Sequence, residues 1–372
     1  MSARVPFAPQ FSHLVYMRVF EGCNLHCEHC FIPKNPKRMT HDDIVASVLD
    51  LRKFAKPGQT ILVQWHGGEP TMFGAKWLSD AIDAVEAAAP EFKFEHGIQT
   101  NLMTYDSAWA DLYHRKFGSN VGVSWDPVIR LLNRSQPQSN AIYEEKFWKN
   151  LAQLIQDGLD PYLVVTATKA FFDTFRNPIA FFEKLTAAGV RKAHLERLTE
   201  TGYARDNWLR LGVDNASYSR NMSRFMRAYA LWKGVEGNGE KLMLSPFDGI
   251  LSSVEQMHKG SVGYGCWSGS CDTRFHTIDA NGYKAGCTAL TSEVDNKAAQ
   301  GKSLNLGQGF QEIRKERRVI HCNGCPYRSV CSSGCLALSM DDGSGECSGG
   351  RGFFETASFI VQKMDQTRGV NA

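Results

Sequence analysis

The sequence lacks the features of membrane-spanning, secreted and polyanion-binding proteins. It has no run of about eighteen uncharged apolar residues, and its first residues include prolines where a signal peptide would be apolar. The 42 Lys and Arg residues nearly balance the 39 Asp and Glu residues, and like charges do not form runs. We therefore expect a cytoplasmic protein that binds neither membranes nor nucleic acid.

Cysteine is the residue type that this sequence does contain in unusual number. A chain of 372 residues with 43% apolar residues predicts a globular protein of two or three domains. Its eleven cysteines should be reduced in the cytoplasm, where clustered thiols usually bind metal. A disulfide framework is not expected.

Short apolar runs alternate with helical periodicity between residues 13 and 200. The predicted strands are 13–20, 61–66, 92–99, 121–126, 162–169 and 192–198, and the predicted helices between them are 41–55, 74–89, 106–116, 141–157 and 177–188. About six βα units predict either a doubly wound parallel sheet or a partial (β/α) barrel. Both folds gather reactive groups at the carboxyl ends of their strands.

Polar and special residues follow these strands in the sequence. The first strand leads into CNLHCEHC (23–30), the second into GGEP (67–70), the third into QTN (99–101), and the fourth into SWD (124–126). Because parallel strands end at one edge of a sheet, we expect these four motifs to meet there.

The chain changes character near residue 240, where we place a domain boundary. Residues 13–240 contain the βα repeat, helices are expected at 216–233 and 247–257, and residues 241–372 are richer in loops. This second region contains eight thiols, which could stabilise it through bonds to metal: Cys266, Cys271, Cys287, Cys322, Cys325, Cys331, Cys335 and Cys347.

The spacing of the cysteines suits iron–sulfur clusters. Cys23, Cys27 and Cys30 can hold three irons of a [4Fe–4S] cluster and leave the fourth iron open to a chelating ligand. The eight later thiols can hold two further clusters with four ligands each. The alternatives are zinc sites, the first completed by His26 or His29, or incidental thiols.

These motifs resemble those of radical S-adenosylmethionine (SAM) enzymes, and the C-terminal spacing resembles their SPASM extension. The resemblance covers about residues 13–350 and implies a partial (β/α)6 TIM-like barrel followed by a loop-rich SPASM domain. It implies three [4Fe–4S] clusters, one binding SAM and two auxiliary. By similarity to anaerobic sulfatase-maturing enzymes, the first auxiliary cluster would be held by Cys266, Cys271, Cys287 and Cys335, and the second by Cys322, Cys325, Cys331 and Cys347, with Cys266 or Cys271 as the additional ligand.

The resemblance also implies a set of contacts to SAM. Gly67, Gly68 and Glu69 would meet the ammonium group, because glycine permits close approach of the backbone. Ser124 and Asp126 would meet the ribose hydroxyls, and Arg134 the carboxylate. Gln99 and Asn101 would order the loop or touch SAM.

The implied activity is reductive cleavage of SAM to a 5′-deoxyadenosyl radical, with an electron donor such as flavodoxin or ferredoxin. The radical would abstract hydrogen from a peptide or protein side chain, which would then be oxidised or crosslinked. The alternatives are the same chemistry on a small molecule, such as a sugar or aminocyclitol alcohol, and a zinc-binding module without activity. Because about twelve residues precede the first strand, we expect a separate leader-recognition protein, or a leader that binds the barrel directly.

Two departures from the sulfatase-maturing pattern limit what the resemblance implies. Thr288 stands where those enzymes have an aspartate that serves as base, and threonine cannot do this near neutral pH. Trp125-Asp126-Pro127 replaces an aliphatic residue followed by Asp-Gly. Formylglycine formation is therefore not favoured. Candidates for a substitute base are Asp272, His276, Glu196 and Glu200.

Overall fold

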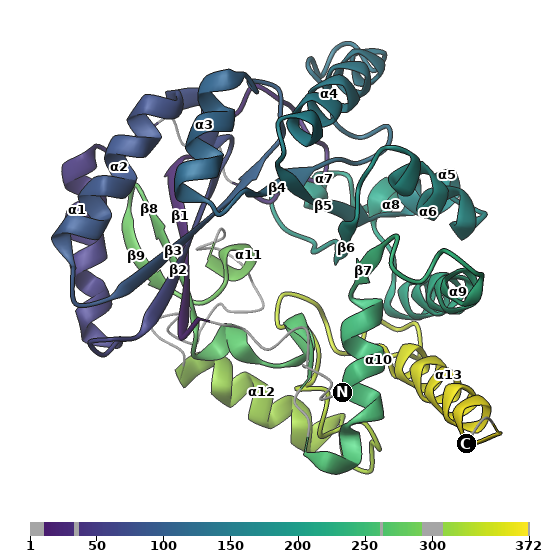
Figure 1. The fold of residues 1–372 in the computed structure, drawn as a ribbon. Coiled ribbons are helices and arrows are strands. Elements are labelled where there is room, and N and C mark those ends of the chain that lie inside the picture. The colour runs from purple at the N-terminus through teal and green to yellow at the C-terminus, as the bar shows by residue number, and fades with distance from the viewer. Residues whose placement is uncertain (1–10, 33–36, 261–262, 292–307, 371–372) are drawn as a thin grey trace.

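A curved nine-stranded sheet forms the centre of the protein in the computed structural model (Figure 1), which describes residues 11–32, 37–260, 263–291 and 308–370. The strands lie in the order β7-β6-β5-β4-β3-β2-β1-β8-β9, and all pairs are parallel except β8–β9. They are β1 (His13–Phe20), β2 (Thr60–Gly67), β3 (Lys93–Thr100), β4 (Asn120–Ser124), β5 (Asp160–Ala167), β6 (Lys192–Arg197), β7 (Met243–Ser245), β8 (Phe275–Asp279) and β9 (Gly282–Ala285). The predicted partial barrel of parallel strands is confirmed.

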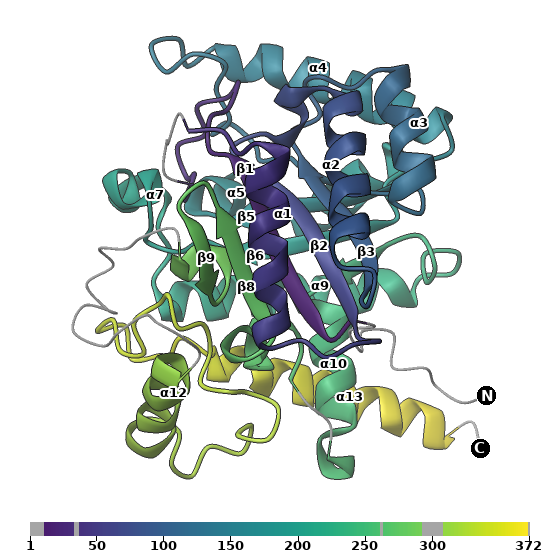
Figure 2. The ribbon, with the colours of Figure 1, turned by 90° about the vertical axis from the view of Figure 1, so that its left-hand side faces the viewer.

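Helices cover the outer face of this sheet, as Figures 1 and 2 show. The α-helices are α1 (His41–Leu49), α2 (Ala75–Ala88), α3 (Ser107–Lys116), α4 (Ser139–Gln156), α5 (Lys169–Thr174), α6 (Pro178–Ala187), α7 (Tyr203–Asp206), α8 (Trp208–Leu211), α9 (Asn215–Gly234), α10 (Phe247–Glu255), α11 (Thr288–Thr291), α12 (Gln308–Ile320) and α13 (Arg351–Val370). Short 3₁₀ turns are η1 (Asp50–Lys53), η2 (Pro70–Phe73), η3 (Met257–Lys259), η4 (Gly265–Trp267) and η5 (Ser270–Asp272). Each predicted helix is present, with its ends shifted by a few residues.

Local sequence signals account for the first helix. Thr40 is its N-cap, and the Asp43 backbone N–H donates to Thr40 Oγ1 at 3.1 Å while the Thr40 N–H donates to Asp43 Oδ2 at 2.8 Å. This reciprocal capping box satisfies two backbone donors that a helix start leaves free. Ile44 and Val48, four residues apart, then bury one face of α1 against the sheet.

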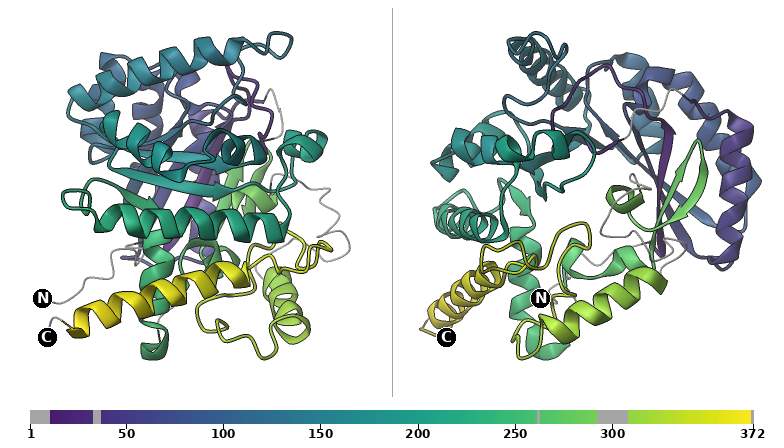
Figure 3. Two further views of the ribbon diagram at one scale, coloured as in Figure 1. Left: turned by 90° about the vertical axis from the view of Figure 1, so that its right-hand side faces the viewer. Right: turned by 180° about the vertical axis from the view of Figure 1, so that it is seen from behind.

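The sheet continues past residue 240 at both of its edges. β7 pairs with β6, and the β8–β9 hairpin pairs with β1. Helix α13 packs along α9, as Figure 3 shows, and also against α10. One hydrophobic cluster includes Trp267 and Phe353 together with the barrel core. The domain division at residue 240 therefore stays a prediction, and the two regions share a sheet and a core.

A buried ion pair joins β8 to the first strand. Arg18 and Asp279 are both 1% exposed, and Arg18 Nη2 lies 3.1 Å from Asp279 Oδ2. Arg18 also contacts Glu21, which lies just before the CNLHCEHC motif. This network couples the C-terminal region to the start of that motif. Among the described residues, no helix is long and apolar enough to cross a membrane.

Candidate active site

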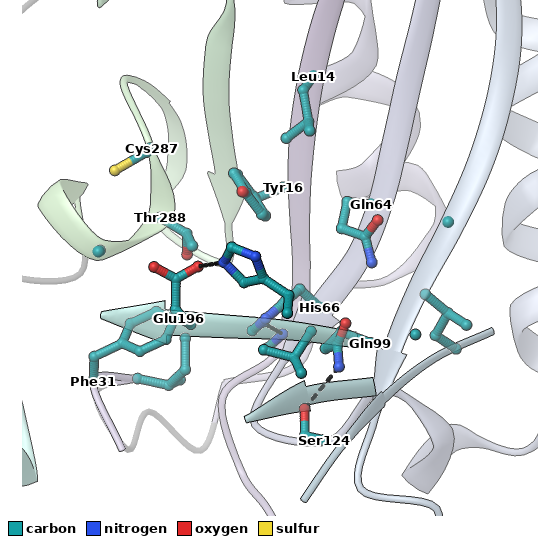
Figure 4. A pocket seen from close by; sticks show the side chains of 18 of the residues that line it. Leu14, Tyr16, Phe31, Gln64, His66, Gln99, Ser124, Glu196, Cys287 and Thr288 are labelled. Carbon is teal, nitrogen blue, oxygen red and sulfur yellow. Dashed lines mark hydrogen bonds and ion pairs between the residues drawn. The ribbon is translucent and has the colours of Figure 1, made fainter. Parts of the chain in front are cut away.

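A cavity of about 1090 Å³ occupies the inner side of the curved sheet. The motifs that follow β1 to β4 line it, as do side chains from the interior of the strands and thiols from the C-terminal region. Figure 4 shows this wall, with Tyr16, Gln64, Gln99 and Ser124 on successive strands. The expected meeting of the motifs at one edge of the sheet is confirmed.

Two glycines make room for polar side chains on the cavity wall. Gln64 on β2 is in register with Gly97 on β3, and Gln99 on β3 with Gly122 on β4. A Cβ atom at either glycine would lie 2.4 Å from the neighbouring glutamine Oε1. The glutamines therefore lie flat across these glycines. Gln99 Nε2 then donates to Ser124 Oγ at 2.8 Å, which fixes the positions of both side chains.

The three N-terminal thiols share one loop beside the cavity. Cys23, Cys27 and Cys30 all line the cavity, close enough that a thiolate at one position would raise the pKa of a neighbouring thiol. Burial, together with the negative charge of Glu69, raises the pKa of Cys23 to about 12. Burial likewise raises the pKa of Cys27, an effect that Arg130 opposes. The Cys23 and Cys27 thiols are therefore protonated at neutral pH, and a bound metal would have to displace their protons.

The GGEP turn packs directly against the end of β1. Gly68 donates its N–H to Phe20 O at 2.8 Å, and Glu69 donates its N–H to Gly22 O at 3.0 Å. A Cβ atom at Gly68 would lie 2.0 Å from Gly22 O, and Gly67 has φ of +131°. The glycines are thus required by contact between the two loops, a reason that the sequence does not reveal.

Glu69 is the most completely hydrogen-bonded carboxylate of this edge. It is 1% exposed, and its Oε1 accepts from Thr71 N–H (3.1 Å), Thr71 Oγ1 (2.7 Å) and Thr100 Oγ1 (2.9 Å). Its Oε2 accepts from Asn101 N–H at 2.7 Å. Burial raises the pKa of Glu69, and these hydrogen bonds oppose that rise. Glu69 lines the cavity, so a cation there could still reach the carboxylate.

Asn101 connects the third strand to the thiol loop. Its Nδ2 donates to Asn24 Oδ1 at 2.7 Å and lies 3.7 Å from Cys23 Sγ. The prediction that Asn101 orders the loop therefore has a direct structural basis. Whether Gln99, Asn101 and the other residues of this edge touch SAM stays a prediction.

The remaining SAM contacts were predicted at Ser124, Asp126 and Arg134, and the structure places them differently. Ser124 lines the cavity. Asp126 is fully buried behind the lining, with Oδ2 accepting from Arg130 Nε at 2.8 Å and Oδ1 accepting from Thr166 N–H. Arg134 is exposed, and its guanidinium carbon lies 4.0 Å from the centroid of the Tyr203 ring. The contacts of all three with SAM stay predictions.

The C-terminal thiols lie in two groups. The thiols of Cys266 and Cys335 are hydrogen-bonded, Cys271 interacts electrostatically with Cys266, and Cys287 interacts with Cys335. All four line the cavity. In the second group Cys322 interacts with Cys325 and Cys347, and Cys331 with Cys322 and Cys347. Within the described part of the chain, no three His, Cys, Asp or Glu side chains are placed to hold a single metal ion.

Of the four candidate bases, Glu196 alone has a described side chain that lines the cavity. Figure 4 shows its carboxylate near Thr288. Burial acts to raise the pKa of Glu196, but the hydrogen bond and charge of His194 hold it below its usual value. The His276 ring packs against Phe54 and Tyr283, Glu200 is exposed, and the side chain of Asp272 lies outside the described residues.

His66 and Arg130 are among the cavity residues that the sequence analysis did not identify. His66 Nδ1 accepts from Gly67 N–H at 2.8 Å, and burial lowers the pKa of His66 to about 4, so the ring is neutral with its proton on Nε2. The period-two alternation along β2, which places Gln64 and His66 on one face, could have indicated this position. Arg130 contacts Cys27, and its position four residues after Asp126 is its only sequence signal.

We predict that Glu69→Gln weakens SAM binding. Its amide would place an N–H group against either the Asn101 N–H or the Thr71 and Thr100 donors, and it would remove the charge available to an ammonium group. Loss of a charge-assisted hydrogen bond should make the free energy of SAM binding less favourable by roughly 1.5–3 kcal/mol. Equilibrium dialysis with labelled SAM measures the loss, and Glu145→Gln, which changes an exposed carboxylate on α4 away from the cavity lining, is the control. Unchanged affinity in Glu69→Gln would contradict the assignment.

Comparison with known proteins shows what this chain is similar to. Residues 17–126 match the model of the radical SAM superfamily. The serine-type anaerobic sulfatase-maturating enzyme of Klebsiella aerogenes is 23% identical to this chain. The alignment covers 94% of this chain and 85% of that enzyme. The structure of native anSMEcpe with bound AdoMet and Cp18Cys peptide has a TM-score of 0.69 at 17% identity, covering 95% of this chain and 99% of that one.

A peptide maturase of known structure is also similar. SuiB of Streptococcus suis, bound to its precursor peptide SuiA, has a TM-score of 0.56 at 14% identity, covering 88% of this chain and 72% of that one. These structures share the fold of this chain. The chain thus carries a radical SAM domain, matched over residues 17–126, and over most of its length it is similar to anaerobic sulfatase-maturating enzymes.

Proposed function

We propose that this enzyme oxidises a side chain of a peptide or protein and that the product carries a new bond between residues. The observation that carries the proposal is the composition of one cavity of about 1090 Å³. Cys23, Cys27 and Cys30 of the barrel line it together with Cys266, Cys271, Cys287 and Cys335 of the C-terminal region. A substrate held there would be within reach of both groups of thiols.

The residues suit three [4Fe–4S] clusters. Within each group the thiols lie close enough that a thiolate at one position would raise the pKa of another. Cys23, Cys27 and Cys30 would hold the cluster that binds SAM, and the two C-terminal groups would hold the auxiliary clusters. When bound, the first cluster and SAM supply the radical that removes a hydrogen atom, and the auxiliary clusters accept one electron.

The edge of the sheet suits the amino-acid end of SAM. Glu69 lines the cavity beside Cys23, where its charge favours an ammonium group. Ser124, fixed by Gln99, offers a hydroxyl to the ribose. Asn101 holds the thiol loop in place through Asn24. These side chains orient SAM and exclude water from the space beside the thiols.

Similar structures support a peptide as substrate. The anSMEcpe and SuiB structures each hold a peptide, and their fold extends over most of this chain. A leader peptide could be bound by the open side of the barrel or by a separate recognition protein. An electron donor such as flavodoxin or ferredoxin would supply the reducing electron in the cytoplasm.

Glu196 is placed to receive the proton that oxidation releases. Bond formation at a substrate radical removes one electron and one proton, the latter from the attacking N–H, O–H or S–H group. The Glu196 carboxylate is 48% exposed to the cavity, and His194 Nε2 lies 3.1 Å from its Oε2. His194 Nδ1 contacts Ser245 Oγ at 2.6 Å, which contacts Tyr264 Oη at 2.6 Å. This chain of groups can carry the proton away.

Replacing Cys23, Cys27 and Cys30 together with Ala should abolish formation of 5′-deoxyadenosine. The wild-type chain should contain about twelve irons and the variant about eight, because the auxiliary ligands remain. Iron, zinc and sulfide analysis after anaerobic reconstitution gives the content, and chromatography after dithionite reduction gives the nucleoside. Deoxyadenosine from the triple variant would refute the assignment of the reducing cluster, and zinc without sulfide in the wild type would refute the clusters altogether.

With a short precursor peptide encoded beside the gene, the product should be about 2 Da lighter per turnover, with one deoxyadenosine formed per event, as a single hydrogen abstraction coupled to oxidation requires. Tandem mass spectrometry should locate the loss at a linked pair of residues. An aldehyde at a serine or cysteine would contradict bond formation. Equal mass loss from a small alcohol, with no reaction of any neighbouring peptide, would favour the small-molecule alternative.

Glu196→Gln should separate SAM cleavage from product formation. Deoxyadenosine should form at close to the wild-type rate, while product per deoxyadenosine should fall roughly 10²-fold, the usual contribution of a general base. Glu200→Gln is the matched control, because it neutralises an exposed carboxylate in the adjoining loop. A wild-type ratio of product to deoxyadenosine in Glu196→Gln would remove this residue from the mechanism.

A further inference from the structure

Arg130 directs its guanidinium at one of the three N-terminal thiols. Its Nη1 lies 3.8 Å from Cys27 Sγ, within hydrogen-bonding range of a sulfur acceptor. Both residues are 9% exposed, so water screens the contact little. Arg130 also lines the cavity that the thiols share.

The backbone fixes this contact from both sides. The His26 N–H donates to Leu131 O at 2.7 Å, and the Glu28 N–H donates to Ile129 O at 3.1 Å. Cys27 therefore lies between two backbone hydrogen bonds, directly opposite Arg130. The thiol loop cannot move away from the arginine without breaking them.

The guanidinium is held by a buried carboxylate. Asp126 Oδ2 accepts from Arg130 Nε at 2.8 Å and from Nη2 at 2.7 Å, and His29 Nε2 lies 3.2 Å from the same oxygen. Two of the three guanidinium nitrogens thus face the carboxylate, and Nη1 faces the sulfur. A planar arginine can serve both partners at once, which the single ammonium group of lysine cannot.

The loop that presents Arg130 is strained. Val128 has φ of 60°, a conformation that β-branched residues rarely adopt. Asn140 Nδ2 donates to Arg130 O at 3.1 Å and helps to hold the loop in this shape. Such strain persists only where the surroundings determine the conformation, and it concentrates at functional positions.

We propose that Arg130 is a positioning residue that raises the reduction potential of the cluster held by Cys23, Cys27 and Cys30. The inference rests on the proposed cluster. A hydrogen bond and a fixed positive charge at a ligand sulfur stabilise the more negative, reduced state, and hydrogen bonds to sulfur are an established determinant of cluster potential. The side chain would thereby ease entry of the electron that SAM cleavage needs.

The test is a redox titration of reconstituted holoenzyme followed by electron paramagnetic resonance. The spectrum of the variant that lacks Cys23, Cys27 and Cys30 is subtracted to isolate the N-terminal cluster. Arg130→Met should lower its midpoint potential by at least a tenfold change in the one-electron equilibrium, about 59 mV. Arg130→Lys, which keeps the charge, should lower it less.

The matched control is Arg210→Met. Arg210 lies 2.5 Å from Glu28, next to Cys27 in sequence, but its side chain is 53% exposed and contacts no sulfur among the residues that the structure describes. Its loss should leave the potential unchanged. An unchanged potential in Arg130→Met, or an equal fall in both methionine variants, would overturn the proposal.

Two further outcomes are decisive. If neither Arg130 variant assembles the N-terminal cluster, the residue serves folding of the loop and the proposal fails. If the subtraction leaves no N-terminal signal even in the wild type, the cluster assignment itself is wrong, and the proposal fails with it.

Discussion

Parallel pairing of the strands is the constraint on which the rest of the structure depends. Because β1 to β6 run in one direction, their carboxyl ends lie along one edge, and each following loop must pack against its neighbours there. The Gly67-Gly68 turn meets the end of β1, and Asn101 meets the thiol loop. The loops are therefore held by one another, and contacts with neighbouring loops fix the shape of the thiol-bearing loop.

The same sheet brings the C-terminal thiols to the barrel. β8 pairs with β1 in register, and the buried Arg18–Asp279 pair secures that junction. Removing Arg18 would leave the buried Glu21 carboxylate without this partner, which is destabilising. The hairpin leads directly to Cys287, which faces the cavity. The distance between the N-terminal and C-terminal thiols is therefore set mainly by the extended sheet, and less by contact between separate domains.

Periodic segments and motif positions were predictable from sequence, because period-two and period-3.6 patterns and the rule on parallel strands act locally. The Thr40 capping box is an example. The closing hairpin was not predictable, since Gly282–Ala285 shows no strong strand pattern and gains its partner only through the sheet. Helices α12 and α13 were also missed. Residues 308–320 form α12, but they lie within a region that the sequence predicted to be rich in loops.

The candidate site was likewise only partly predictable from the sequence. Thiol spacing drew attention to all eleven cysteines, because spacing is a property of the sequence itself. The resemblance to sulfatase-maturing enzymes divided the later eight into two groups, and their role as ligands stays a prediction. The partners of buried charges could not be inferred, since they depend on how loops meet. Asp126 was expected at the ribose, yet its carboxylate holds Arg130. Arg130 in turn lies at Cys27, while Arg134, four residues later, stacks on Tyr203.

Burial of the thiols explains why arginine side chains lie beside two of them. Burial raises the pKa of most of these cysteines, so thiolates in the same places require positive charge nearby. Arg314, 7% exposed, lies with Nη2 3.3 Å from Cys271 Sγ, as Arg130 lies beside Cys27. Arginine keeps its charge when buried and loses less hydration than lysine. The protein thus places a permanent cation at one thiol in each of the two groups that face the cavity, and it does so from different elements of the fold.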